Sequence, residues 1–219
     1  MTDFAHARKL MVDNQLRTSS VTDRRVLAAM GEVPREEFVI GSRHGLAYID
    51  EPLPLAGAPG RLLGSPAPFA RLVQLAAVEP TDHVLVLASG SGYSAAVLAR
   101  LAASVVAVES HAGLAGIARD TLGRLGVSNV MIEVGPIETA GAGKGPYDLI
   151  VIEGTVPEVP PALFSQLKSG GRLVALISAE GRPAVAHLFA HSGDGIASRA
   201  EFDARLPPLA AAKAESFVF

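Results

Sequence analysis

Residues 83–93, HVLVLASGSGY, decide the fold class of this chain. They open with a short apolar run, residues 83–88, and continue into a loop of serines and glycines, residues 89–92. Strands that are apolar throughout are buried on both faces, as in parallel sheets covered by helices. Glycines directly after such a strand let the backbone approach a ligand and turn its amides toward it. We therefore predict a buried strand, a ligand-binding loop and, from Tyr93, a helix.

Other motifs with glycine at this place fit less well. A nucleophile elbow needs serine in the middle of G-x-S-x-G, and the middle of residues 88–92 is Gly90. A P-loop needs the triplet Gly-Lys-Ser/Thr, which the sequence lacks. A dinucleotide site favours a third glycine, and the chain has Ala95 at that place. Because the motif tolerates alanine there, a dinucleotide stays open on spacing alone.

A second apolar run, residues 104–109, ends in an acidic residue. Glu109 follows Gly92 by seventeen positions. The carboxyl ends of parallel strands meet at one edge of the sheet, and a carboxylate there can accept hydrogen bonds from ribose hydroxyls. The glycines and Glu109 together predict a ligand that contains a nucleoside. The alternative is that the glycines only form a tight turn and that Glu109 is a solvated strand end.

The rest of the chain alternates helical and strand patterns, which favours a doubly wound α/β sheet. Helical periodicity or strand-like apolar runs predict strands at 104–109, 129–134, 147–153 and 172–178, and helices at 24–30, 68–78, 93–101, 112–125 and 160–168. Residues 48–68 are rich in proline and glycine, and long irregular segments of this kind are often binding loops. Alternation in 198–206 and 215–219 predicts antiparallel strands.

Composition excludes several classes of protein. The 219 residues are 49% hydrophobic and 19% charged, which predicts a packed core and argues against disorder. The net charge of −3 argues against general nucleic-acid binding. Cysteine is absent, so no thiolate nucleophile or disulfide is possible. The sequence shows no secretory leader and no long apolar span, so we expect a cytoplasmic protein that does not enter a membrane.

The sequence resembles the protein-L-isoaspartate O-methyltransferase family, within the class I S-adenosylmethionine (SAM)-dependent methyltransferases. The resemblance covers residues 11–180, and its N-terminal motifs are the most specific part. The motifs that carry it are Asn14-Gln15-Leu16-Arg17, Val26-Leu27-Ala28-Ala29-Met30, Val33-Pro34-Arg35-Glu36-Glu37-Phe38-Val39, Ala47-Tyr48, Leu53-Pro54-Leu55, the glycine loop 90–99, Pro146-Tyr147-Asp148-Leu149-Ile150 and Leu167-Lys168-Ser169-Gly170-Gly171-Arg172-Leu173.

The resemblance implies a Rossmann-like SAM-binding sheet with a reversed final strand, an N-terminal helical cap, and a protein or peptide acceptor. It divides one domain, 1–219, into a cap and substrate loop (1–66), a SAM-binding core (67–180) and C-terminal strands (181–219). SAM would lie along the loop, with Glu109 on its ribose and Glu153 near the methyl donor. The implied cofactor-binding residues are Ala88, Ser89, Gly90, Gly92, Tyr93, Glu109, Pro136, Ile137 and Glu153.

The cofactor side departs from the family pattern at three positions. The family's first strand ends with an acidic residue two positions before a glycine, and this chain has Val86 and Ala88 there. The family's Gly-Asp after the third strand is Gly135-Pro136. Loss of a charge-assisted contact of this kind weakens binding by roughly 1.5–3 kcal/mol. We expect SAM to bind more weakly than in the family at large.

The substrate loop departs further. The family pattern Gly-Gln-Thr-x-Ser-x-Pro becomes residues 60–66, GRLLGSP. The candidate acceptor-binding residues are Leu62, Leu63, Gly64 and Ser65, and the hydroxyl positions of the family are Leu62 and Gly64. Ser65 either replaces the lost hydroxyls or caps the following helix. Because a carboxylate acceptor is poorly paired without them, we expect isoaspartyl repair to be weak.

Other polar residues carry weaker signals. His187 and His191 share one face of a helix or strand, with only Asp194 nearby, so we predict no metal site. Arg24-Arg25 and Arg35-Glu36-Glu37 have the pattern of solvated helix charges.

Three functional hypotheses follow from these residues and this resemblance. The first is a SAM-dependent methyltransferase of the isoaspartyl-repair family. The second is a methyltransferase that acts on another acceptor. The third is a non-catalytic homologue that binds a nucleoside ligand or a protein partner. The sequence assigns no catalytic residue and no oligomeric state.

Overall fold

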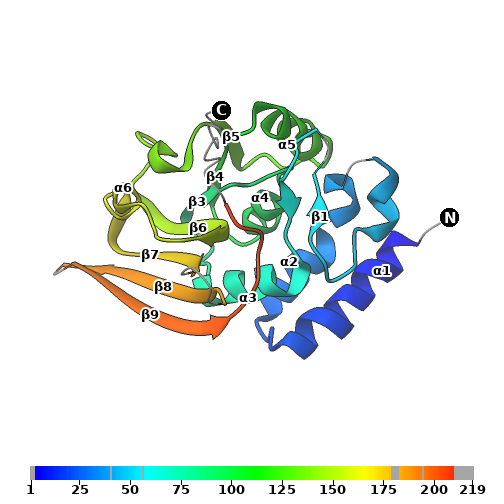
Figure 1. Ribbon diagram of the computed structural model, residues 1–219, viewed down its shortest axis with the longest axis horizontal. Coiled ribbons are helices and arrows are strands. Elements are labelled where there is room, and N and C mark those ends of the chain that lie inside the picture. The colour runs from blue at the N-terminus through cyan, green and yellow to red at the C-terminus, as the bar shows by residue number, and fades with distance from the viewer. Residues whose placement is uncertain (1–2, 40, 56, 179–182, 194, 210–219) are drawn as a thin grey trace, which may run out of the picture.

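The fold is described from a computed structural model, which covers residues 3–39, 41–55, 57–178, 183–193 and 195–209. A seven-stranded sheet runs through it in the order β5-β4-β3-β6-β7-β8-β9 (Figure 1). Its parallel strands are β3 (His83–Leu87), β4 (Ser104–Glu109), β5 (Val130–Val134), β6 (Tyr147–Val156) and β7 (Leu167–Ile177). The predicted α/β sheet is confirmed, and β3 lies inside it between β4 and β6.

Both faces of β3 and β4 are covered, which explains why these two strands are almost entirely apolar. Successive residues of β3 enter two separate cores, with Val84 and Val86 in one and Leu85 and Leu87 in the other. Side chains of a strand point alternately to the two faces, so a strand covered on both sides keeps no polar position.

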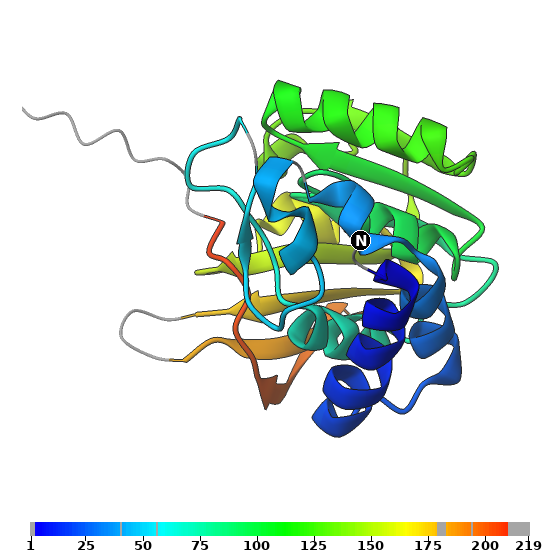
Figure 2. The same ribbon diagram turned by 90° about the vertical axis from the view of Figure 1, so that its right-hand side faces the viewer.

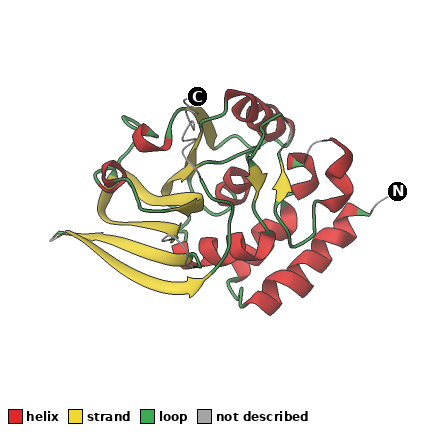
Figure 3. Cartoon of the chain, viewed as in Figure 1, coloured by secondary structure: helices red, strands yellow, loops and turns green. Residues whose placement is uncertain are grey.

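Helices of unequal size cover the two faces. The first core lies under α3 (Pro66–Ala76), α4 (Tyr93–Ala99) and α5 (Ala112–Arg124). The second core is closed by the four-residue α6 (Pro161–Phe164) and the 3-10 turn η5 (Ile137–Thr139). Figure 3 shows most of the long strands on the left and the helices of the N-terminal half on the right.

The N-terminal segment forms a helical cap beside α3 and α4. It contains α1 (Phe4–Met11), η1 (Val12–Leu16), η2 (Arg17–Ser19), α2 (Arg24–Glu32), η3 (Arg35–Phe38) and η4 (Gly41–Leu46), and its α-helices are blue in Figure 2. Asp23 caps α2 by accepting a hydrogen bond from the amide of Arg25 at 2.7 Å. No helix among the described residues is both long and apolar enough to span a bilayer.

The C-terminal part adds an antiparallel hairpin, β8 (Val185–Ser192) and β9 (Gly195–Asp203). The predicted antiparallel strands are confirmed in β9, whereas β8 was missed and residues 215–219 lie outside the described part of the chain. The reversed strand is β8 rather than the last one, because β9 turns back and forms the sheet edge. His187 and His191 lie on β8, and Asp194 is not among the described residues.

Two other segments lie near the carboxyl ends of β4 and β6. Strands β1 (Leu53–Pro54) and β2 (Leu62–Leu63) pair with each other and hold a loop between them. After β9 the chain, residues 204–209, crosses the end of β6, and we call this segment the C-terminal strap. Figure 2 shows the strap, in red, beside the cyan loop that connects β1 and β2.

Two further sequence predictions, for residues 160–168 and for Arg35 with Glu36, were wrong. The helix predicted at 160–168 is only the four residues of α6, because β7 begins at Leu167 and pairs with Tyr147 of β6. Arg35 and Glu36 are not solvated but buried, with 0% and 7% exposure. A hydrogen-bonded cluster replaces water for Glu36, since Arg8 donates to it at 3.0 Å and the hydroxyl of Tyr48 also donates to it.

Candidate functional site

The glycine loop forms the centre of the site at the carboxyl end of β3. Three of its residues have left-handed backbone conformations, with φ of 61° at Ala88, 55° at Gly90 and 97° at Gly92. A β-carbon at Gly92 would lie 3.0 Å from Ala118 of α5, so the close packing of loop and helix requires glycine. Alanine in this conformation costs roughly 1–2 kcal/mol. The loop is held in a fixed shape that turns amides toward the strand ends.

Glu109 binds this loop directly. Its carboxylate is buried, with 0% exposure, and accepts hydrogen bonds from the amides of Gly90 and His111, both at 2.8 Å. The glycine loop and Glu109 therefore meet at one edge of the sheet, as expected, and Glu109 is not a solvated strand end.

Arg61 also binds Glu109, and the sequence did not suggest this contact. Its two terminal nitrogens donate to the two carboxylate oxygens at 2.6 and 2.7 Å. Arg61 lies in the loop between β1 and β2, and its side chain is 24% exposed. The loop expected to receive the acceptor thus reaches the residue expected to hold the ribose.

Glu153 lies three residues before the end of β6, which runs on to Val156, and on the other side of β3 from Glu109. The pairing of β6 with β7 shifts register between Val151 and Thr155, and such an irregularity redirects a side chain. Its oxygen Oε2 is buried and has no hydrogen-bond partner among the described residues. Burial raises the pKa of Glu153 to about 7, against the opposing charges of Arg35 and Arg61. The carboxyl group changes protonation near neutral pH.

A buried polar floor surrounds Glu153. Arg35 is fully buried, its guanidinium stacks 4.7 Å from the ring centre of Tyr93, and burial lowers its pKa. Four of the other buried polar atoms that lack a hydrogen-bond partner among the described residues belong to this floor: Arg35 Nη1, Ser89 Oγ, Tyr93 OH and Ser94 Oγ. Buried polar groups are rarely left unpaired, so this floor has the chemistry of a site for a polar ligand or ordered water.

The cap helps to fix the loop above this floor. Ser91 donates a hydrogen bond to the carbonyl of Phe38 at 2.8 Å, and the ring of Tyr93 packs edge-on against that of Phe38. Arg35 donates to the carbonyls of Ala47 and Gly64, both at 2.7 Å. The sequence motif Val33–Val39 therefore joins the cofactor loop to the substrate loop.

The candidate acceptor residues lie next to the C-terminal strap. Leu62 pairs with Pro54, and Leu63 is buried. A β-carbon at Gly64 would lie only 2.7 Å from Leu206 Cδ2 of the strap. The strap thus occupies the space that a side chain at this position would need. Ser65 occupies the N-cap position of α3, but its side chain makes no capping hydrogen bond.

The residues expected near the adenine follow β5. The amide of Gly135 donates to the carbonyl of Glu109 at 3.2 Å, so this segment lies against the end of β4. Pro136 is exposed, and the half-buried Ile137 packs against the second core. This segment therefore lies beside the strand end that carries Glu109.

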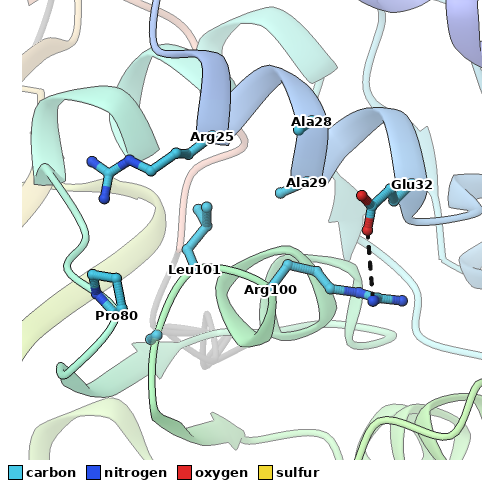
Figure 4. A pocket seen from close by; sticks show the side chains of 8 residues that line it. Arg25, Ala28, Ala29, Glu32, Pro80, Arg100 and Leu101 are labelled. Carbon is cyan, nitrogen blue, oxygen red and sulfur yellow. Dashed lines mark ion pairs between the residues drawn. The ribbon is translucent and has the colours of Figure 1, made fainter.

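A hollow of about 410 Å³ lies elsewhere, between α2 and the turns that precede β3 and β4 (Figure 4). Arg25, Pro80 and Leu101 are among its lining residues, and an ion pair joins Glu32 to Arg100 at 3.6 Å. It is at the amino-terminal edge of the sheet, opposite the glycine loop. Ligands of doubly wound sheets bind at the carboxyl edge, so we do not assign this hollow to the site.

Comparison with known proteins identifies the family. The model of the family "Protein-L-isoaspartate(D-aspartate) O-methyltransferase (PCMT)" matches residues 6–209. The chain belongs to this family. Its members are SAM-dependent methyltransferases that act on proteins.

Named relatives extend the match over most of the chain. A protein-L-isoaspartate O-methyltransferase of Koribacter versatilis is 44% identical over 174 residues, covering 80% of this chain and 78% of the relative. One from Roseiflexus sp. is 38% identical over 208 residues, covering 94% and 93%.

Two solved structures share the fold. A structure of a protein-L-isoaspartate O-methyltransferase superposes with a TM-score of 0.82 at 28% identity, covering 93% of this chain and 66% of that one. A putative member from Plasmodium falciparum, solved in complex with S-adenosyl-L-homocysteine, has a TM-score of 0.78 at 21% identity, with 93% and 98% covered.

Proposed function

We propose that this chain binds SAM across the glycine loop and transfers a methyl group to a carboxylate of a protein or peptide. The observation that supports this most is the meeting of the Gly90 amide and the Glu109 carboxylate at the carboxyl ends of β3 and β4. The carboxylate lies where doubly wound sheets bind nucleotides, and it can accept from a ribose diol once one of its present donors leaves.

The residues present fit such a cofactor. The loop amides and the carboxylate suit a ribose, and the unpaired oxygens of Ser89, Ser94 and Glu153 suit polar groups on the ligand. When bound, SAM supplies an activated methyl group, so the protein needs mainly to orient the acceptor and to exclude water. We assign the cofactor role to Ala88, Ser89, Gly90, Gly92, Tyr93, Glu109, Pro136, Ile137 and Glu153.

The acceptor side supports only weak isoaspartyl repair. Leu62 and Gly64 carry no hydroxyl, and the packing of Leu206 against Gly64 leaves no room to restore one there. A carboxylate that reaches these two positions finds no hydroxyl donor there, and a poorly paired polar group lowers the rate for such a substrate.

Calorimetry with S-adenosylhomocysteine (SAH) tests the cofactor site first. We expect Glu109→Ala to weaken binding by about 1–3 kcal/mol, because the ribose loses its acceptor. Arg124→Ala, which breaks an exposed ion pair with Glu37 on the outer side of α5, is the matched control and should bind SAH like the parent. Equal affinity in the Glu109→Ala variant and the parent would remove Glu109 from the site.

A methyl-transfer assay on an isoaspartyl peptide at saturating SAM then tests the acceptor. We expect slow turnover. Turnover comparable to that of a repair enzyme would contradict the proposed weakness and would assign the orienting role to other groups of the loop. No binding of SAM or SAH would favour a non-catalytic homologue with a protein partner.

A second candidate function rests on Glu153. A carboxyl group with a pKa of about 7 and an unpaired oxygen can take a proton from an acceptor that must lose one, such as an amine or a hydroxyl. A carboxylate acceptor needs no such base. Turnover of an amine or hydroxyl acceptor that rises through pH 7 in the parent, and not in Glu153→Gln, would support this function over the first.

A further inference from the structure

The carboxylate of Glu109 has no free hydrogen-bonding position in this structure. Oε1 accepts from Arg61 Nη1 at 2.6 Å and from the His111 amide at 2.8 Å. Oε2 accepts from Arg61 Nη2 at 2.7 Å and from the Gly90 amide at 2.8 Å. A carboxylate offers about four lone-pair sites, these four donors occupy them, and the hydroxyl of Ser110 also donates to Oε1 at 3.4 Å. A ribose diol that binds Glu109 must therefore displace one of these donors.

Arg61 is the donor that can leave. The amides of Gly90 and His111 are fixed by the glycine loop and by the start of α5. Arg61 projects from the loop between β1 and β2, and its side chain is 24% exposed. Among the described residues, the other hydrogen bonds of its guanidinium are long, 3.4 Å to Ser110 Oγ and 3.4 Å to the carbonyl of Ala88. Displacement costs an ion pair but disturbs no backbone.

The displaced guanidinium would lie where the acceptor needs a cation. Glu109 and Glu153 both place negative charge near the site, and a carboxylate acceptor adds a third. Arg35 cannot form an ion pair with the acceptor, since it is fully buried and already donates hydrogen bonds to two backbone carbonyls. Arg61 directly precedes Leu62 and Leu63 of the substrate loop, and a guanidinium binds carboxylates with a two-pronged geometry.

We propose that Arg61 is the acceptor-binding residue of this chain, and that it exchanges the carboxylate of Glu109 for the carboxylate of the acceptor when the ribose takes Glu109. The proposal rests on the proposed function for the identity of cofactor and acceptor. Its consequence is a coupling between the two sites: the cofactor releases Arg61, and the acceptor then holds Arg61 away from Glu109. Each ligand therefore raises the affinity for the other by the same factor.

The first experiment measures SAH binding by calorimetry in the parent, in Arg61→Ala and in the control Arg124→Ala. We expect Arg61→Ala to bind SAH roughly tenfold more tightly, because the ribose no longer competes with a two-pronged ion pair. The control should match the parent. Arg61→Lys keeps the positive charge but not the planar, two-pronged guanidinium, so its affinity for SAH should lie between those of the parent and of Arg61→Ala. It also serves as the test variant if Arg61→Ala fails to fold.

The second experiment measures binding of an isoaspartyl peptide, by fluorescence anisotropy, with and without saturating SAH. In the parent, SAH should raise peptide affinity at least about fivefold. In Arg61→Ala this gain should vanish, and the peptide should bind the SAH complex more weakly than in the parent. The peptide methyl ester, which lacks the negative charge, should show no Arg61-dependent gain in either protein.

The outcomes separate this proposal from the proposed function. SAH that binds equally to the parent and to Arg61→Ala overturns the exchange while the cofactor site stands. A peptide gain that survives in Arg61→Ala, or a peptide that does not bind the SAH complex of the parent, overturns the acceptor role. Binding of SAH only after removal of Arg61 supports the exchange. Binding of SAH to neither protein overturns the proposed function and this proposal with it.

Discussion

Two glutamates lie near the carboxyl ends of the strands on either side of β3, and their surroundings are opposite. Glu109, at the end of β4, accepts two hydrogen bonds from backbone amides, two from Arg61 and a longer one from the hydroxyl of Ser110. Glu153, three residues before the end of β6, has a buried oxygen without a partner among the described residues, and burial raises its pKa to about 7. One carboxylate is held in place by many donors, whereas the other is held by few and changes charge near neutral pH.

The difference between the two carboxylates indicates different roles for the β4 and β6 sides of the site. A carboxylate surrounded by fixed donors suits a ligand group that must be placed accurately, such as a ribose diol. A carboxylate with a raised pKa destabilises the fold when it ionises, and such unfavourable groups cluster at functional sites. Under the proposed function, Glu109 would place the ribose, and Glu153 would keep a titratable group on the β6 side of the site.

The largest expected effect is on stability and tests the Glu109 side. Glu109→Ala leaves Arg61 without its partner and two loop amides without an acceptor. We expect the free energy of unfolding, measured with urea at pH 7, to fall by about 3–5 kcal/mol. Glu109→Gln keeps one acceptor oxygen and should lose less. A loss under about 1 kcal/mol in Glu109→Ala would mean that these bonds contribute little, and the contrast with Glu153 would fail.

The next effect concerns Glu153 and depends on pH. Its pKa is about 7 in the folded protein and 4.5 when unperturbed, so the folded state binds more protons between these values. Stability from this group is therefore fully present below pH 4.5 and is lost as pH rises through 7. We expect Glu153→Gln to be more stable than the parent by up to about 3 kcal/mol at pH 8.

The check is urea unfolding of the parent and of Glu153→Gln at pH 5, 6, 7 and 8. The difference between the two proteins should shrink toward pH 5, where the parent's carboxyl is protonated. Glu36→Gln is a useful comparison, because that carboxyl is also buried but is bonded to Arg8 and Tyr48. A difference that does not change with pH would show that Glu153 is ionised throughout.

The smallest expected effect tests whether an ion pair stabilises the protein when its side chains are exposed to solvent. Arg124 and Glu37 form an ion pair at 2.7 Å, close in length to that of Arg61 with Glu109, but their side chains are 59% and 33% exposed. We expect Arg124→Ala to change the free energy of unfolding by less than about 1 kcal/mol. An effect as large as that of Glu109→Ala would show that charge pairing alone, and not the buried network, sets the stability of the site.

Local patterns were sufficient to predict the sheet. Strands β3 and β4 are apolar runs because both of their faces are covered, whereas the edge strand β5 leaves Met131 and Val134 49% and 50% exposed. The glycine loop and Glu109 also follow from local sequence, since a strand end and the next strand end meet at one edge of the sheet. Strand β8 was missed because VAHLFAHS shows no clean alternation of apolar and polar residues.

Long-range contacts could not be predicted from the sequence. Arg35 has the pattern of a surface charge, yet backbone carbonyls of Ala47 and Gly64 bind it inside the molecule. The pairing of Arg61 with Glu109 joins residues that are 48 positions apart, and no spacing rule links them. Gly64 looks like a lost hydroxyl in the sequence, and only the packing of Leu206 explains why glycine is required.

The C-terminal strap has a consequence for the order in which the site is assembled during folding. Thr155 donates from its amide to Pro207 and from its hydroxyl to Leu206, both at 2.9 Å, and Leu206 fills the space over Gly64. These contacts join early and late parts of the chain, so they form only after β8 and β9 have docked. The glycine loop and Glu109 need only β3 and β4. During synthesis, the cofactor half can therefore take shape while the acceptor half still lacks its last wall.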